Sequence, residues 1–168
     1  MMWVGLMALG LVVWWQGPLA LANEAGPAVQ LDEELVRDVV LRANSDVVYG
    51  QAYRASNPDL LQTAWAGEAL LDIQEDILAL QALGQYLDLQ LEGLEFRRIQ
   101  ELGPARVRAI TVERWLARLY QVDGAYLGFQ RQVVENRYVV ERRGDDWYVI
   151  EADQEIQGGD PVFRQGEP

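Results

Sequence analysis

The stretch that decides the fold reads Arg137-Tyr138-Val139-Val140-Glu141-Arg142-Arg143-Gly144-Asp145-Asp146-Trp147-Tyr148-Val149-Ile150. Two apolar runs flank a polar centre in which Gly144 precedes two aspartates, a composition typical of a tight β-turn. The stretch therefore predicts a β-hairpin close to the end of the domain.

Upstream of this hairpin the apolar residues recur with a period of two. Three leucines at positions 87, 89 and 91 alternate with polar residues, and Gly93 then shifts the phase. A glycine at a change of phase indicates a β-bulge in a long, bent strand. Turn signals at Gly103-Pro104 and Asp123-Gly124 separate further strands, which we expect over residues 105–121, 126–142 and 147–153. The result is a four-stranded antiparallel meander.

The residues before the meander have a helical period instead. Apolar side chains recur at intervals of three and four from Leu35 to Val48, which predicts a helix from Asp32 to Ala55. Asn57-Pro58 is a typical helix start, so a short second helix should run to Trp65, and a third should end at Gly84. The predicted fold class is α+β, with three N-terminal helices packed on a bent four-stranded antiparallel sheet.

The N-terminal segment has a different character from the domain. Residues 1–22 contain no charged side chain, and Ala20-Leu21-Ala22 supplies small residues at the positions that signal peptidase reads. We therefore interpret residues 1–22 as a signal peptide or membrane anchor, residues 23–30 as a linker and residues 31–156 as the domain. Residues 157–168 are rich in Gly, Pro and charge and should form a poorly ordered tail. The protein is expected in the periplasm or outside the cell, released or anchored, with residues 1–22 as its only membrane contact.

Composition narrows the function classes. The 168 residues include no Cys, no His and no Lys, which excludes zinc sites built on Cys or His, catalytic triads, Cys nucleophiles and Schiff bases. With 26 acidic residues against 14 arginines the net charge is −12, which disfavours nucleic acid as a partner. We expect no metal, no cofactor and no enzymatic activity.

The closing hairpin, the segment from Asn57 to Leu70 and the pair Arg114-Trp115 resemble the NTF2-like (SnoaL-like) superfamily. Within it, the chain is most similar to the intermembrane-space domain of the chloroplast-division ARC6 proteins and their bacterial relatives. This resemblance implies a cone-shaped, noncatalytic domain that presents a groove or sheet face to another protein.

Some members of that superfamily are isomerases or dehydratases that use an acidic base with tyrosine donors in the cone. The residues of this chain that could form such a pocket are Asp46, Tyr49, Tyr53, Glu113 and Glu135. A small-molecule isomerase or dehydratase is therefore the alternative function. It would require one desolvated carboxylate and a phenol directed at the developing oxyanion.

The strand over residues 105–121 offers a candidate binding surface. Its arginines, Arg106, Arg108, Arg114 and Arg118, fit either cross-strand ion pairs on a solvated face or a stripe that binds an acidic partner. Because successive residues of a strand point to opposite faces, Trp115 lies on the other face from Arg114 and Leu116. If Trp115 faces the core, as Trp65 and Trp147 should, the opposite face presents Arg114, Leu116, Arg118 and Tyr120. We predict that this sheet face binds a protein partner or a second copy.

Overall fold

The computed structural model describes residues 32–52, 58–160 and 162–166 as one α+β domain. Its elements, in chain order, are α1 (Glu33–Gln51), the 3-10 helix η1 (Pro58–Thr63), α2 (Gly67–Ala82), β1 (Gln85–Gly103), β2 (Arg106–Gln121), β3 (Tyr126–Arg143) and β4 (Asp146–Gly159). The four strands form an antiparallel sheet in the order β1-β2-β3-β4. The expected meander is confirmed.

The helical part differs from the expectation in one element. The described residues contain two α-helices, because the segment after Pro58 is a six-residue 3-10 helix rather than a second α-helix. A run this short gains few α-helical hydrogen bonds, and Gly67, at φ 65°, then redirects the chain into α2. The first helix begins as expected, with the Asp32 side chain accepting a hydrogen bond from Leu35 N at 3.2 Å. It ends at Gln51, four residues before the expected end at Ala55, with Ala52 already in an extended conformation; residues 53–55 of the expected helix lie outside the described residues.

The long strands bend where the sequence indicated. The pairing of β1 with β2 shifts between Leu91 and Gly93, which confirms the predicted β-bulge, and shifts again between Phe96 and Arg98. At the other edge, β4 continues to Gly159, six residues beyond the expected end. Arg164 and Phe129 then exchange two backbone hydrogen bonds of 2.9 and 2.7 Å. Residues 157–160 and 162–166 therefore differ from the poorly ordered tail that composition predicted, because they satisfy backbone groups of β3 that would otherwise lack partners.

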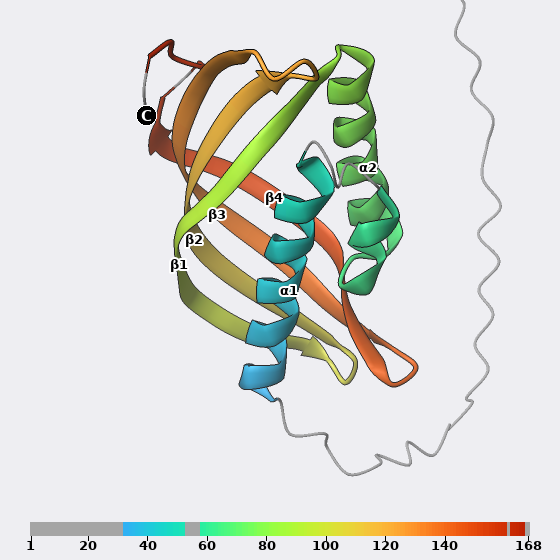
Figure 1. Ribbon diagram of the computed structural model, residues 1–168. Coiled ribbons are helices and arrows are strands. Elements are labelled where there is room, and N and C mark those ends of the chain that lie inside the picture. The colour runs from blue at the N-terminus through green and yellow to red at the C-terminus, as the bar shows by residue number, and fades with distance from the viewer. Residues whose placement is uncertain (1–31, 53–57, 161, 167–168) are drawn as a thin grey trace, which may run out of the picture.

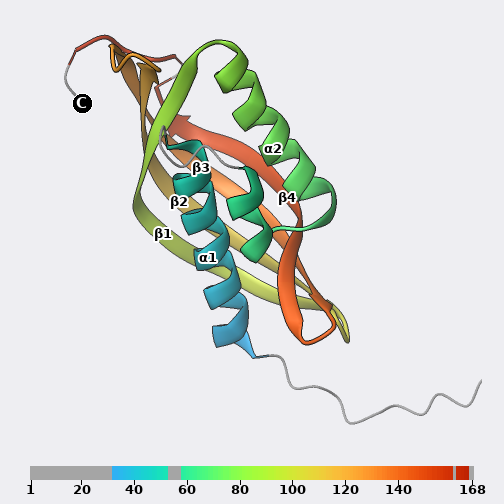
Figure 2. The same ribbon diagram turned by 45° about the vertical axis from the view of Figure 1, so that its right-hand side comes forward.

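Both helices pack on the same face of the curved sheet (Figures 1 and 2). We call this the inner face and the opposite one the outer face. The core between the helices and the inner face contains Val36, Val39, Val40, Ala43, Leu61, Ala64, Trp65, Ala69, Ile77, Val107, Ala109, Tyr138, Val140 and Val149. Alternation along β2 sends residues 107, 109, 111 and 113 inward, and the residues between them outward. The chain thus has one buried sheet face and one that no described helix covers.

None of the helices in the described residues is long and apolar enough to cross a membrane. The predicted signal peptide or anchor, residues 1–22, and the linker that follows it lie outside the described residues.

Candidate functional site

A carboxylate lies in the middle of the apolar core. Glu113, at an inward position of β2, has 0% of its surface exposed. Its polar neighbours Asn44 from α1, Thr111 from β2 and Asn136 from β3 are also buried. A charge in such a place is tolerated only when hydrogen bonds replace the water it has lost.

Five side chains supply those hydrogen bonds. The first carboxylate oxygen, Oε1, accepts from Thr111 Oγ1 at 2.7 Å, Tyr138 OH at 2.9 Å and Asn44 Nδ2 at 3.1 Å. The second, Oε2, accepts from Asn136 Nδ2 at 2.7 Å and Trp115 Nε1 at 2.9 Å. We call Glu113 and these five donors the Glu113 cluster. All five donors are neutral groups, so a buried negative charge is held without a cation among its hydrogen-bond partners.

This arrangement limits the chemistry of Glu113. A carboxylate offers about four lone-pair directions, and five donors occupy them. To take a proton from a substrate, Glu113 would first have to lose a partner, which leaves a buried donor unsatisfied. Burial, followed by the charge of Glu113 and the hydrogen bond to it, raises the pKa of Tyr138 well above 10. The phenol therefore remains a neutral donor. The cluster joins α1 to β2 and β3, as a structural network does.

The other residues proposed for a catalytic pocket do not join Glu113. Asp46 lies on α1 and accepts a hydrogen bond from Thr63 Oγ1 at 2.6 Å. Burial raises the pKa of Asp46, and hydrogen bonds from Thr63 and the Ala64 backbone act against this rise. Tyr49 is 62% exposed. Glu135 lies on the outer face, in an ion pair with Arg137 at 2.7 Å, and Tyr53 is outside the described residues. The structure thus brings only Glu113 of the described pocket residues into the interior.

Sequence reasoning missed the four partners Asn44, Thr111, Asn136 and Tyr138. A signal for two of them exists: Thr111 lies two positions from the buried Ala109, and Asn136 lies two positions from the buried Val134 and Tyr138. Polar residues at inward positions usually bond one another. Alternation alone could not say which donors would reach which carboxylate, because the partners come from three separate elements.

The predicted binding surface lies on the outer face, but one of its four residues is buried. Trp115 points inward, as its bond to Glu113 shows, so Arg114, Leu116 and Arg118 lie outward. Leu116, however, is only 2% exposed. Its neighbours in the register are Gln90 and Arg131, and these long side chains, with the flanking arginines, shield it. Leu116 is therefore not available as a contact residue.

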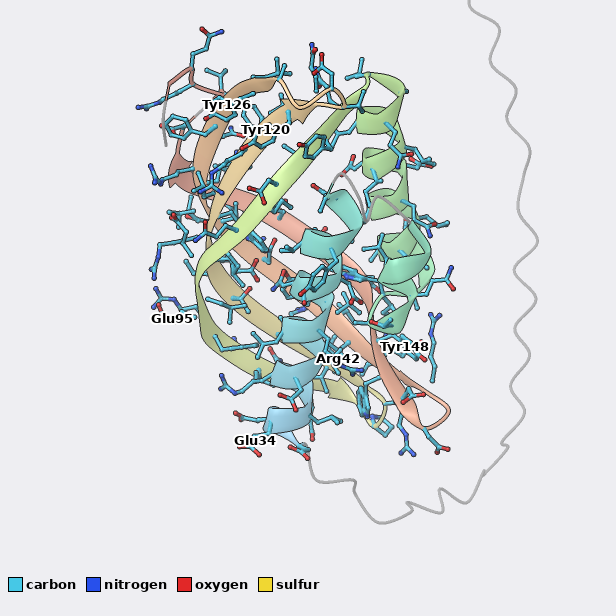
Figure 3. All side chains as sticks on the ribbon, in the orientation of Figure 1. Glu34, Arg42, Glu95, Tyr120, Tyr126 and Tyr148 are labelled. Carbon is cyan, nitrogen blue, oxygen red and sulfur yellow. The ribbon has the colours of Figure 1, made fainter. Side chains whose placement is uncertain are left out.

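Tyr120 is part of an aromatic row at one end of the sheet. Its ring stacks on Tyr86 of β1, with ring centres 5.2 Å apart, and contacts Tyr126 of β3 at 5.3 Å. Figure 3 shows Tyr120 and Tyr126 together at this end, far from Glu34 at the start of α1. Tyr126 is 39% exposed. Three aromatic side chains from three strands form a partly exposed apolar surface, which we call the tyrosine row.

The four arginines of β2 divide into two pairs. Arg106 binds Glu141 at 3.2 Å and Glu151 at 2.7 Å, and Arg118 binds Asp88 at 3.1 Å. For these two the interpretation as cross-strand ion pairs is confirmed. Arg108 and Arg114 are exposed and form no ion pair with the described residues. The described residues also contain no cluster of three acidic side chains that could hold a metal ion.

Comparison with known protein families finds no match, and no curated protein sequence matches either. Solved structures do match. The intermembrane space region of the chloroplast protein ARC6 superposes with a TM-score of 0.68 at 14% identity, over 76% of this chain and 99% of that one. A hexachlorocyclohexane dehydrochlorinase, LinA type 2, gives a TM-score of 0.52 at 16% identity, over 81% and 95% of the two chains. LinA type 3 from Novosphingobium barchaimii LL02 gives 0.52 at 14% identity, over 81% and 97%.

These similarities show that the chain has the NTF2-like fold. The matching structures are of two kinds, an ARC6 domain and LinA enzymes. Sequence identities of 14 to 16% show a shared fold and nothing about shared function.

Proposed function

We propose that this domain is a noncatalytic protein-binding module whose contact surface is the outer face of the sheet. The observation that carries the proposal is the state of Glu113, the one pocket carboxylate in the interior. It is fully buried and saturated by five donors, so the group that an NTF2-like enzyme would need as a base is engaged in the structure of the core. The intermembrane space region of ARC6 also superposes with a higher TM-score than the LinA enzymes do, 0.68 against 0.52.

The outer face has what a contact surface needs. Aromatic residues and arginines are enriched in protein interfaces, and here the tyrosine row lies at one end of a face where Arg108 and Arg114 form no ion pair with the described residues. No described helix covers this face (Figure 2). The partner is a second copy of the chain or another protein.

Sedimentation of the purified domain tests the self-association form. We expect concentration-dependent association that Tyr120→Ala weakens by about 1 to 2 kcal/mol, because that substitution removes the central ring of the row. Tyr49→Ala, which removes an exposed tyrosine from α1, is the matched control and should change nothing. A wild-type monomer at high concentration removes the self-association form and leaves only a different protein as partner.

The alternative, a small-molecule isomerase or dehydratase, is favoured by one observation, the LinA similarity at a TM-score of 0.52. Turnover of a small carbonyl or chlorinated substrate that is lost in Glu113→Gln, with the fold retained, would overturn the noncatalytic proposal.

We also propose that the protein is exported, on the strength of the uncharged segment over residues 1–22. A fusion of residues 1–30 to a reporter active only outside the cytoplasm should be active, and an inactive fusion would refute export.

A further inference from the structure

The outer face contains a depression to which all four strands contribute residues. It has a volume of about 620 Å³ and is lined by Arg97, Arg98, Ile110, Val112, Glu135 and Gln157. Ile110 and Val112 form its floor on consecutive outward positions of β2, and both are partly buried. An apolar floor with a few charged groups at its border is the usual make-up of a binding site.

Arginines without partners surround this floor. Arg108 and Arg114 are the next outward residues of β2 on either side of Ile110 and Val112, and Arg98 lies across from Ile110 on β1. All three are exposed, and none forms an ion pair with the described residues. Nine other arginines in the described residues do form one. Three of the four arginines without an ion pair in the described residues therefore lie at one place, in a chain of net charge −12.

Three carboxylates next to the depression already have arginine partners. Glu95, labelled in Figure 3 and opposite Val112, pairs with Arg97 at 3.0 Å. Glu135 and Glu155 both pair with Arg137, at 2.7 and 2.8 Å. These three carboxylates therefore leave Arg98, Arg108 and Arg114 without an ion pair in the described residues, and guanidinium groups bind carboxylates in strong, bidentate pairs.

The position of Arg114 is fixed by a glycine. A Cβ added at Gly93 would collide with the Arg114 guanidinium, so this side chain lies across β1 on the space that Gly93 leaves free. The φ of Gly93 is not in the left-handed region, so the backbone itself does not require glycine there. The small residue lets the Arg114 guanidinium lie over β1, the strand that carries Arg98.

We propose that this depression binds an extended acidic segment of another protein, an inference that rests on the proposed protein-binding function. Arg108 and Arg114 are six residues apart on β2, about 20 Å in an extended chain, with two apolar positions between them. A strand-like segment with acidic residues at i and i+6 and apolar residues at i+2 and i+4 matches this order. The net charge of −12 repels an acidic partner at long range, but salt at 0.15 M screens that repulsion beyond about 8 Å.

An anionic membrane is the other binder that three arginines could suggest. The observations favour the peptide, because the apolar floor is sunk between the arginines and the overall negative charge of the protein opposes a flat anionic surface.

The test uses an acetylated and amidated seven-residue peptide with Glu at its first and last positions, Leu at the third and fifth, and Ser elsewhere. Binding to the ¹⁵N-labelled domain at 0.15 M salt is measured by NMR titration. We expect shifts of β1 and β2 amides around residues 93–98 and 108–114, and a Kd raised about 3- to 10-fold in Arg98→Gln, Arg108→Gln or Arg114→Gln. Gly93→Ala should raise it too, because it displaces Arg114 without changing the charge.

Arg42→Gln is the matched control, since Arg42 is also exposed and without an ion pair among the described residues, but lies on α1 (Figure 3). The proposal is overturned if the same peptide with Gln in place of Glu binds equally well, if Arg42→Gln weakens binding as much as Arg98→Gln, or if anionic phospholipid vesicles bind in place of the peptide. Self-association that is lost in Arg98→Gln would assign the depression to a second copy and also overturn it. Failure of peptide binding leaves Tyr120-dependent association intact, whereas substrate turnover through Glu113 refutes the proposed function itself.

Discussion

The two faces of one strand, β2, handle charge in opposite ways. On the inner face, Glu113 is buried with no cation among its partners and is held by five neutral donors. On the outer face, Arg106 and Arg118 are partly exposed and held by carboxylates. The comparison shows that burial, rather than residue type, decides how much a charged side chain depends on its partners within the protein. In the core a missing partner costs the full desolvation of a polar group, whereas on the surface water replaces it.

The largest effect is expected at Glu113. Glu113→Ala would remove the Glu113 acceptor from four donors, while Tyr138 OH keeps Asn44 Oδ1 at 3.2 Å; at about 1 to 3 kcal/mol for each lost partner, this is enough to unfold a typical domain. Glu113→Gln keeps the shape but turns one acceptor into a donor that faces other donors, and should cost about 2 to 4 kcal/mol. Urea denaturation measures both, with the exposed Glu95→Gln as control. If Glu113→Gln were as stable as wild type, the cluster would not be the structural network described here.

A smaller effect is expected for Tyr138→Phe, which removes one of the five donors and should cost about 1 to 2 kcal/mol at pH 7. The variant also differs in its response to alkali. Because the pKa of Tyr138 is raised in the folded state, the unfolded chain loses this proton first, and the stability of the wild type falls as the pH rises above 10. Tyr138→Phe should lose less stability between pH 9 and 11. Identical pH slopes for the two proteins would show that Tyr138 does not have this raised pKa.

The smallest effect is expected on the outer face. Arg106→Gln removes two ion pairs, with Glu141 and Glu151, yet should cost only about 0.5 kcal/mol. The loss should shrink further in 0.5 M salt, since both partners are in contact with solvent. Thermal denaturation at low and high salt measures it. A salt-independent loss of 2 kcal/mol or more would contradict the contrast between the faces.

The fold was largely predictable from local patterns. Period-two alternation with turn residues located four strands, and Gly93 located a bulge, because both are properties of neighbouring residues. The two misjudged elements depend on tertiary context. The segment after Pro58 is too short to choose its helix type from sequence, and residues 157–160 and 162–166 are ordered because β3 offers backbone groups for them to pair with.

The candidate site was predictable only in part. Glu113 was identified as a possible pocket residue, but its proposed partners Asp46 and Glu135 lie elsewhere. Leu116 was assigned to the correct face, yet its burial by long polar neighbours depends on the register of three strands.

The sequence by itself determined the α+β class, the antiparallel meander and the assignment of alternate residues of β2 to opposite faces, since each follows from periodicity and turn chemistry within a short segment. The tertiary structure decided which charges found partners. Asn44 and Glu113 are 69 positions apart and form a hydrogen bond, whereas Arg98 has Glu95 and Glu101 three positions away along the chain and forms no ion pair with the described residues. Hydrogen bonds and ion pairs act over a few ångströms of space, and only packing brings distant segments within that range.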